Sequence, residues 1–309
     1  MNPSNKTFLE TFNTIEFEKI KDHPNILIAA NFWDGERYMA AKTCYKFMRA
    51  IDDLIDDHKT IHAKIAESEK KQFSVQVNEW IKTIIDADNQ NPLKMELVQT
   101  VDKFKIPFWP LEAFAKSMIY DIYFDGFPTI NDFIDYAGGA SVAPASIFVH
   151  LCGLSEQNGQ YTEPCFNLKE ASTPCAIFSY LVHIIRDFQK DQLNHLNYFA
   201  DDVIAKNKLT RTDLKNIANG APVSIGFRNL IEEYVALAEV YKQQTYKMIH
   251  ELRPCLNARY QLSLEIIFNL YLMVFERIDI KRGSFTSEEL NPTPEEIRKR
   301  VYETIINFN

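Results

Sequence analysis

The stretch Cys175-Ala-Ile-Phe-Ser-Tyr-Leu-Val-His-Ile-Ile-Arg-Asp-Phe-Gln-Lys-Asp191 carries the strongest structural signal in this chain of 309 residues. Positions 175–185 are apolar on nearly every side of a helix, which is typical of a helix buried within a protein. On such a helix His183, Asp187 and Asp191 share one face. An aspartate is almost never fully buried without a partner, because an isolated carboxylate in a low dielectric is very costly. Two aspartates on a core helix therefore require compensation.

A second acidic stretch, Arg49-Ala-Ile-Asp-Asp-Leu-Ile-Asp56, lies within another strongly helical segment. Tyr45, Arg49, Asp52 and Asp56 fall on one face of that helix. Like charges four residues apart repel by roughly 0.2–0.5 kcal/mol, so a bound cation would ease the cluster. Taken alone, the stretch fits the solvated face of an amphipathic helix equally well.

The two stretches together suggest two helices that face each other across a cavity, each with an Asp-x-x-x-Asp pair. A structural ion-pair network through Arg186 is the plainer interpretation. The facing arrangement would suit magnesium, which prefers one or two carboxylates together with water and phosphate oxygens. Metal held in this way neutralises a diphosphate and makes it a better leaving group. Arg49 and Arg186 could bind the same anion bidentately.

Helical periodicity continues along almost the whole chain and predicts one all-α domain over residues 1–309. The final helix has the clearest start, because Thr293 can cap it, Pro294 fits its first position and Glu296 completes a capping box. The predicted helices cover 6–21, 35–58, 62–88, 92–104, 110–123, 130–137, 142–153, 168–193, 210–218, 223–252, 256–280 and 294–307.

Composition excludes several classes of protein. A net charge of −8 argues against nonspecific nucleic-acid binding, which needs a concentrated basic surface. No apolar run is long enough to span a bilayer, and the polar start of the chain does not resemble a signal peptide. The five scattered cysteines make a disulfide framework unexpected, so we expect reduced thiols in a cytoplasmic protein. These cysteines are Cys44, Cys152, Cys165, Cys175 and Cys255.

The motifs resemble those of the squalene/phytoene synthases, the head-to-head trans-isoprenyl diphosphate synthases. The segment from Tyr45 to Asp56 is similar to the family's first aspartate motif, and Arg186 to Asp191 is similar to the second. The two motifs stand at the separation expected in the family, and the resemblance extends over about residues 25–282. Further matches are Tyr198 after the second motif, Asp121 on an intervening helix, Tyr271 on a late helix, and Tyr136-Ala-Gly-Gly-Ala-Ser-Val-Ala-Pro144, which resembles the broken helix that cups the substrate.

The resemblance implies a single-domain isoprenoid synthase fold, with helices around a central cavity. It also implies a prenyltransferase that joins two farnesyl or two geranylgeranyl diphosphates through a cyclopropyl diphosphate to a squalene- or phytoene-type hydrocarbon. Magnesium or manganese would assist, with NADPH needed only by a reducing squalene synthase. The implied catalytic metal ligands are Asp52, Asp56, Asp187 and Asp191. The implied diphosphate- or substrate-binding residues are Tyr45, Arg49, Asp121, Tyr180, His183, Arg186, Tyr198 and Tyr271.

An allylic carbocation formed in such an enzyme needs shielding from water and stabilisation by aromatic faces. Phe178, Tyr180, Tyr198, Phe268 and Tyr271 could line the pocket, although plain core packing is the commoner role of any one aromatic residue. Prenyl diphosphate is the expected partner. Peripheral membrane association for product release stays open, as does the oligomeric state.

The sequence departs from the family at several positions. Tyr180 stands where the family usually has Gln, His183 where it has Asn, and Leu196 where it has Arg. Gly138 replaces an aromatic residue that is usual in phytoene synthases. The usual Asn is an oxygen ligand for magnesium, whereas imidazole nitrogen suits zinc or copper better. His183 could bind diphosphate when protonated, act in proton transfer, or only fill space.

Two other functions remain compatible with the sequence. One is a terpene synthase that ionises a single prenyl diphosphate and then cyclises or quenches the cation. The other is a non-catalytic protein that keeps the fold as a binding or assembly module. Retention of all four motif aspartates counts against the second alternative, since those carboxylates have no structural value without metal.

Overall fold

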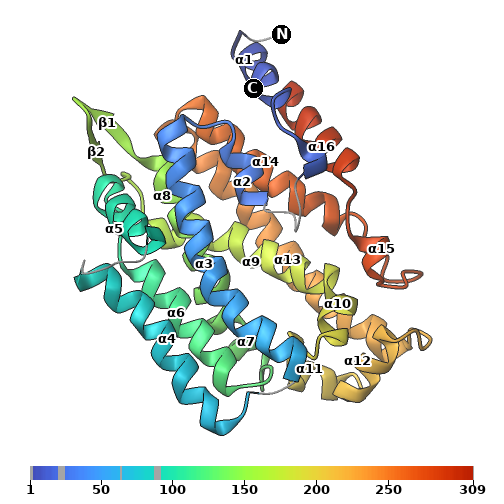
Figure 1. Ribbon diagram of the computed structural model, residues 1–309. Coiled ribbons are helices and arrows are strands. Elements are labelled where there is room, and N and C mark those ends of the chain that lie inside the picture. The colour runs from blue at the N-terminus through green and yellow to red at the C-terminus, as the bar shows by residue number, and fades with distance from the viewer. Residues whose placement is uncertain (1–2, 20–24, 63–64, 87–91, 309) are drawn as a thin grey trace.

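The computed structural model describes residues 3–19, 25–62, 65–86 and 92–308. Its regular structure is almost entirely helical, as the sequence predicts (Figure 1). Within the described residues the only strands are β1 (Ser155–Gln157) and β2 (Gln160–Thr162), an antiparallel hairpin with Ser155 paired to Thr162. Its two turn residues, Asn158 and Gly159, both have positive φ, which matches the right-handed twist of a two-residue hairpin.

The first half of the chain forms a series of helices that ends before this hairpin. They are α1 (Pro3–Phe12), η1 (Phe17–Lys19), α2 (Asn25–Ala30), α3 (Gly35–His62), α4 (Glu67–Asp86), α5 (Pro92–Phe104), α6 (Trp109–Tyr123), α7 (Ile130–Ala137), the π-helical turn η2 (Gly138–Val142) and α8 (Ala143–Gly153).

The second half contains three long helices, α9 (Leu168–Arg186), α13 (Ile225–Leu252) and α14 (Ala258–Phe275), and several shorter ones. The shorter ones are α10 (Phe188–Leu193), α11 (Asp201–Lys206), α12 (Arg211–Ala218), η3 (Arg253–Cys255), α15 (Ser287–Leu290) and α16 (Pro294–Asn307).

The predicted boundaries were wrong in two informative places. The helix predicted over 6–21 ends at Phe12, and only the 3-10 turn η1 follows within the described part of that segment. The helix predicted over 168–193 is divided at Asp187, whose φ of −92° and ψ of 4° lie outside the helical range. By contrast α16 begins as predicted, with Thr293 and Glu296 forming a capping box behind Pro294.

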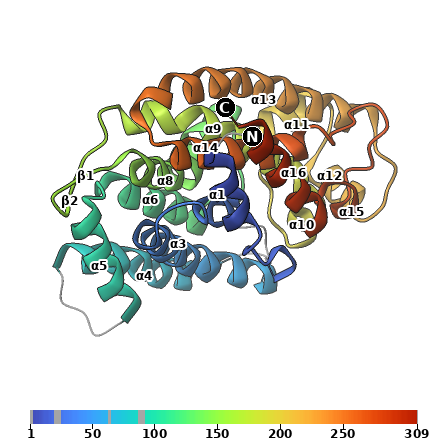
Figure 2. The same cartoon turned by 90° about the horizontal axis from the view of Figure 1, so that it is seen from above.

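Helix α9 is the centre of the molecule, and the prediction that it is buried is confirmed (Figure 1). It packs against α13, α8, α14 and the η2 turn. Seen from above, α3 and α4 lie on one side of the molecule and α13 on the other, with α8 and α9 between them (Figure 2). The helix that carries the second acidic motif is therefore separated from α3, which carries the first, by the interior of the fold.

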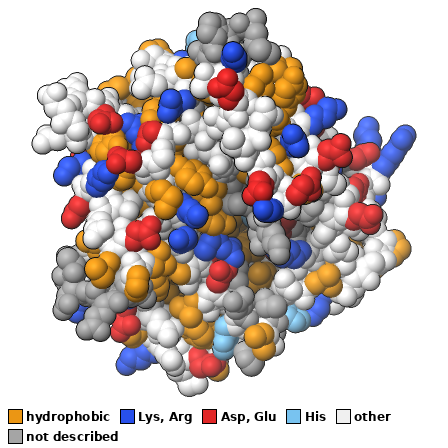
Figure 3. All heavy atoms as spheres, turned by 45° about the horizontal axis from the view of Figure 1, so that its top comes forward, with side chains coloured by type: hydrophobic (Ala, Val, Ile, Leu, Met, Phe, Trp, Pro, Cys, Tyr) orange, Lys and Arg blue, Asp and Glu red, His pale blue; other side chains and the backbone are white. Residues whose placement is uncertain are grey.

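Neither the described helices nor the face in Figure 3 has a membrane span or a charge field of a single sign. No helix in the described ranges is both long and apolar enough to cross a bilayer. Acidic and basic side chains are interspersed over the face shown in Figure 3. That mixture agrees with the net charge of −8.

The segment from α7 through η2 to α8 runs continuously past α6, and one glycine permits the approach. A Cβ atom at Gly139 would lie 2.1 Å from Ser117 Oγ and 2.3 Å from the carbonyl oxygen of Ala113, both on α6. The Ser117 hydroxyl donates to the carbonyl of Tyr136 at 2.9 Å and joins the two segments further. The π-helical turn therefore rests directly on the backbone of α6.

Gly139→Ala should destabilise the protein by about 1–3 kcal/mol, the usual cost of inserting a methyl group into packed backbone. Gly138→Ala is the matched control, because a Cβ at Gly138 would meet nothing within 4 Å. Urea unfolding of both variants measures the difference. Equal stability of the two variants would show that the contact with α6 is not tight.

Candidate active site

Helix α3 presents the first acidic motif to a cavity of about 750 Å³, which is lined by Tyr45, Arg49, Asp52 and Asp53. Arg49 Nη1 donates to Asp52 Oδ2 at 2.9 Å, and the same guanidinium forms an ion pair with Asp53. The side chain of Asp56, predicted to complete the motif, lies outside what the structure describes. Arg49 thus compensates part of the negative charge of its own motif.

The second acidic motif borders the same cavity. His183, Arg186 and Asp187 reach it from the end of α9, and Lys190 and Asp191 reach it from α10. The structure therefore places Asp52 and both aspartates of the second motif around one cavity, as the paired motifs suggest. Leu196 and Tyr198, which follow the second motif, also line the cavity.

Asp187 is buried and doubly bonded by its neighbour in sequence. Arg186 Nε donates to Asp187 Oδ1 at 2.7 Å and Arg186 Nη2 donates to Oδ2 at 2.9 Å, while His183 Nε2 lies 3.0 Å from Oδ2. Burial by itself raises the pKa of the Asp187 carboxyl, but His183 and Arg186 outweigh burial and hold the pKa well below its usual range. The carboxylate is therefore charged although only 8% of the residue is exposed.

The contacts of His183 determine which of its nitrogens carries the proton. Arg186 Nη2 lies 3.3 Å from His183 Nδ1, and a guanidinium can only donate, so Nδ1 accepts. In the neutral ring the proton is then on Nε2, which donates to Asp187 Oδ2. Because Oδ2 has two donors and Oδ1 has one, a carboxylate with about four lone-pair positions retains one on Oδ1 of Asp187 for a further ligand.

Cavity-lining residues change character along the two motif helices. On α9 the lining begins with Ala171 and Ser172 and ends with Arg186 and Asp187, and on α3 Met48 precedes the acidic residues. Much of the remaining wall is apolar and comes from α6, η2, α8, α13 and α14. It includes Phe114, Met118, Ala140, Pro144, Ala145, Phe148, Val149, Met248, Ile249, Leu264 and Ile267. The cavity therefore combines a charged region with an apolar one.

A chain of hydroxyl groups connects the cavity to Asp121. Tyr136 Oη donates to Asp121 Oδ2 at 2.5 Å, and Tyr180 is hydrogen-bonded to Tyr136. Because the Tyr136 proton is used by Asp121, Tyr180 is the donor in the second bond. Tyr136 and Tyr180 line the cavity, whereas Asp121 lies behind Tyr136. Burial raises the pKa of the Asp121 carboxyl to about 7, against the lowering effects of Lys59 and Tyr136.

The predicted aromatic residues divide into two groups. Tyr180, Tyr198 and Tyr271 line the cavity, with the rings of Tyr180 and Tyr198 in edge contact at 6.3 Å. Phe178 and Phe268 instead pack on each other in the core at 5.5 Å, and neither is among the residues that line the cavity. For these two phenylalanines the plainer interpretation, core packing, holds.

Asp53, Lys190 and Tyr136 are among the lining residues that were not predicted as site residues. Asp53 and Lys190 belong to the quoted motifs, so their place beside the predicted ligands was a usable signal. Tyr136 opens the segment that resembles the family's broken helix, but its link to Asp121 depends on how α6 and α7 pack. That link had no sequence signal.

The described carboxylates suit a shared metal better than a closed protein cage. Among the described residues no group of three or more His, Cys, Asp or Glu side chains converges closely enough to hold a metal ion. Magnesium does not require such a group, since it binds through one or two carboxylates with water and substrate phosphate oxygens. Asp52, Asp187 and Asp191, spread around one cavity, fit that pattern.

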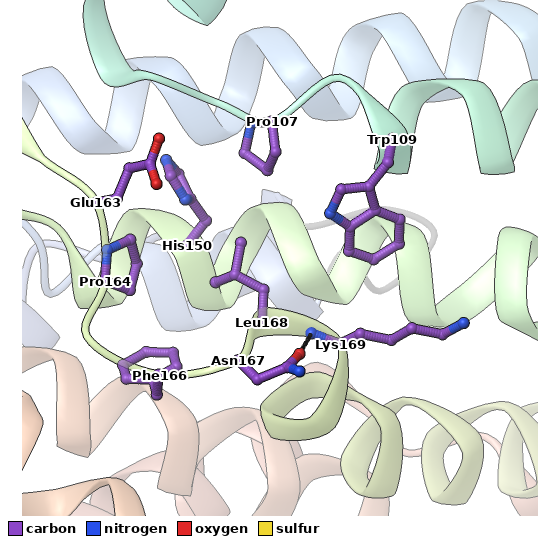
Figure 4. Close-up of a pocket in the computed structure, with 9 residues that line it drawn as sticks. All are labelled: Pro107, Trp109, His150, Glu163, Pro164, Phe166, Asn167, Leu168 and Lys169. Atoms are coloured by element: carbon purple, nitrogen blue, oxygen red, sulfur yellow. Dashed lines mark hydrogen bonds between the residues drawn. The ribbon is translucent and has the colours of Figure 1, made fainter.

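A second, smaller cavity of about 260 Å³ is lined by none of the predicted residues. Its walls are the segment before α6, the middle of α8 and the connector that leads into α9, with Trp109, His150 and Glu163 among the labelled side chains (Figure 4). His150 Nε2 donates to the carbonyl of Phe104 at 2.8 Å, and burial lowers the pKa of this imidazole. This histidine has a structural role and takes no part in the acidic site.

The arrangement of helices around an acidic and apolar cavity defines an all-α isoprenoid synthase fold. A model of the squalene/phytoene synthase family matches residues 21–293, so this chain belongs to that family. No curated protein matches its sequence.

The fold resembles those of several solved structures, among them the following three. A dehydrosqualene synthase in complex with ligand has a TM-score of 0.67 at 16% identity, covering 96% of this chain and 97% of its own. The squalene synthase HpnC from Alicyclobacillus acidocaldarius has a TM-score of 0.64 at 12% identity, covering 89% of this chain and 94% of its own. YisP from Bacillus subtilis subsp. subtilis strain 168 has a TM-score of 0.55 at 15% identity, covering 86% of this chain and 96% of its own. At these identities the similarity establishes the fold.

Asp121→Asn should change how stability depends on pH. The pKa of the Asp121 carboxyl is about 7 in the folded chain against an ordinary value of 3.8, so the folded state binds the proton more tightly. By linkage, the stability that proton binding at Asp121 gives the folded state is fully present below pH 3.8 and is lost as the pH rises through about 7. The unfolding free energy of the variant minus that of the wild type should therefore increase between pH 4 and 8, by at most about 1.4 kcal/mol per pH unit. A difference that stays constant across this range would contradict the assignment.

Proposed function

We propose that this protein is a magnesium-dependent prenyltransferase that condenses two prenyl diphosphates, farnesyl or geranylgeranyl, head to head into a squalene- or phytoene-type hydrocarbon. One observation carries the proposal: Asp52, Asp187 and Asp191 border the same cavity as a broad apolar wall. A prenyl diphosphate has the same division, with a highly charged head and a long hydrocarbon chain. Family membership supports the general reaction.

At the charged region the chain offers cations to the leaving group as well as carboxylates to the metal. Arg49, Arg186 and Lys190 line the cavity beside the acidic motifs. Asp52, Asp187 and Asp191 would hold magnesium, which when bound would supply charge neutralisation for a departing diphosphate. Asp187 is suited to this role because its carboxylate is charged, immobilised by Arg186, and left with a lone-pair position on Oδ1.

The apolar region would hold the hydrocarbon chains and exclude water from the carbocation. Small side chains such as Ala140 and Ala145 leave room there, while Phe114 and Phe148 supply aromatic surface. Tyr180 stacks on Phe133 at 5.4 Å, which fixes its ring at the cavity wall. A fixed aromatic face stabilises a nearby cation without the reorganisation that water would need.

The tyrosine chain behind the cavity offers a route for the proton that leaves the final carbocation. A carboxyl group with a pKa of about 7 exchanges protons readily near neutral pH. Tyr180 and Tyr136 connect that carboxyl, Asp121, to the cavity. We therefore propose proton loss to this chain as the ending of the reaction when no reducing cofactor is supplied.

The test is to incubate the purified protein with magnesium and farnesyl or geranylgeranyl diphosphate, with and without NADPH, and to identify the extracted products by mass spectrometry. We expect a hydrocarbon with twice the carbon number of the substrate. Loss of a residue that only supports a metal ligand typically costs roughly 10–100-fold in activity. Asp191→Asn changes a proposed ligand itself, so it should lower hydrocarbon formation by more than that. Asp102→Asn, which changes an exposed aspartate on α5, is the control and should keep full activity.

Products that retain the carbon number of one substrate would identify a terpene synthase instead. Absence of any product from either substrate in the presence of magnesium would indicate a non-catalytic member of the family.

His183 should act by positioning Asp187, because its Nε2 donates to Oδ2 of that carboxylate. His183→Leu removes this donor and should raise the magnesium concentration needed for half-maximal turnover by about 10–100-fold. His183→Asn restores a donor and adds an oxygen ligand, so it should retain activity and require less magnesium. Magnesium titrations of product formation measure both effects. Identical titrations for wild type and His183→Leu would show that His183 only fills space.

A further inference from the structure

Two cysteines that are far apart in the sequence meet on the surface. Cys165 lies on the connector between β2 and α9, and Cys255 ends the η3 turn between α13 and α14. Both side chains are exposed, and their thiols are close enough to form a hydrogen bond with each other. The other thiols differ, since Cys44 and Cys152 are buried and Cys175 is only partly accessible at the cavity wall.

The connector that carries Cys165 is held tightly against α8. A Cβ atom at Gly153 would lie 2.6 Å from the ring of Phe166 and 2.9 Å from Pro164 Cβ, so the residues on either side of Cys165 pack directly on the α8 backbone. Pro164 and Phe166 also form part of the wall of the smaller cavity in Figure 4.

The turn that carries Cys255 is also fixed. Gln261 Nε2 donates to the carbonyl oxygens of Arg253 at 2.9 Å and Leu256 at 2.6 Å, which are on either side of Cys255. Arg253 Nη2 further bonds Glu265 of α14 at 2.9 Å. The two thiols are therefore presented to each other by two restrained backbone segments.

We propose that Cys165 and Cys255 form a reversible disulfide that joins the entrance of α9 to the entrance of α14. The oxidant is a low-molecular-weight disulfide such as oxidised glutathione. One thiolate attacks that disulfide and releases one glutathione thiol, and the second cysteine then attacks the mixed disulfide and releases the other. Two cysteine thiols and one oxidised glutathione thus become one protein disulfide and two reduced glutathione molecules.

The Cys165 thiol, which is hydrogen-bonded to Cys255, raises the pKa of the Cys255 thiol. A raised pKa disfavours the Cys255 thiolate and slows any attack that starts at this thiol. In a reducing compartment both thiols stay reduced, which agrees with the reduced cysteines expected elsewhere in the chain.

The bond would link two helices that both line the large cavity. α9 contributes Ala171 and Cys175 to its wall, and α14 contributes Leu264 and Ile267. A cross-link between residues so far apart in sequence also restricts the unfolded chain strongly. Oxidation should therefore stabilise the fold and hold the starts of α9 and α14 at a fixed separation.

The full-length protein is incubated with oxidised glutathione and compared with a sample kept in reduced glutathione. We expect intact mass to show the loss of two hydrogen atoms, peptide mapping to find Cys165 linked to Cys255, and native thiol titration to lose the two exposed thiols. The Tm should rise by roughly 5 °C and return to its starting value after reduction.

Cys165→Ser and Cys255→Ser are the control variants, and each should abolish the cross-link and the rise in Tm while leaving the fold intact. Stable glutathione adducts on both cysteines without a cross-link would overturn the proposal. Disulfide-linked dimers as the main product would overturn it as well.

Discussion

The ion pair between Arg186 and Asp187 is the constraint on which the candidate site depends. It lies at the end of the buried helix α9, where a lone carboxylate would be forced to take up a proton. Arg186 supplies two hydrogen bonds and His183 a third, so the carboxylate stays charged inside the protein. Removing one partner of such a pair typically costs about 3–5 kcal/mol, because the other charge is left uncompensated. The same contacts that hold Asp187 in the core leave one lone-pair position on its Oδ1.

The cavity owes its shape to close backbone packing beside it. Gly139 lets the turn between α7 and α8 rest on α6, and the residues that follow it toward the cavity are small, including Ala140 and Ala145. Helix α9, which forms another part of the wall, is itself packed by α13 and α14. The apolar space therefore lies between packed helices, and it adjoins the acidic motifs in the middle of α3 and at the junction of α9 and α10.

Several helices of eight or more residues could be predicted from the sequence, but the six-residue helix α11 and the three-residue strands could not. The helices over 92–104, 130–137 and 294–307 occur with the predicted boundaries, since each combines an apolar period with a breaker or a cap. Helix α11 has only six residues and is held by backbone bonds from Asp201 and Asp202 to the preceding Phe127–Pro128 segment, a long-range contact with no local signal. The hairpin at Asn158-Gly159 did have a local signal, an Asn-Gly turn, but its strands have only three residues each.

The sequence by itself determined which residues share a helix face within each acidic motif. It also determined the order of the motifs along the chain, on which the family resemblance depends. Helical periodicity states which side chains point the same way, but not what lies opposite them. That depends on long-range packing. Only the tertiary structure decided that Phe178 and Phe268 pack on each other in the core, that Asp121 lies behind Tyr136, and that Cys165 meets Cys255. Each of these outcomes joins residues from different elements, and the relative placement of those elements is set by the packing of the whole core around α9.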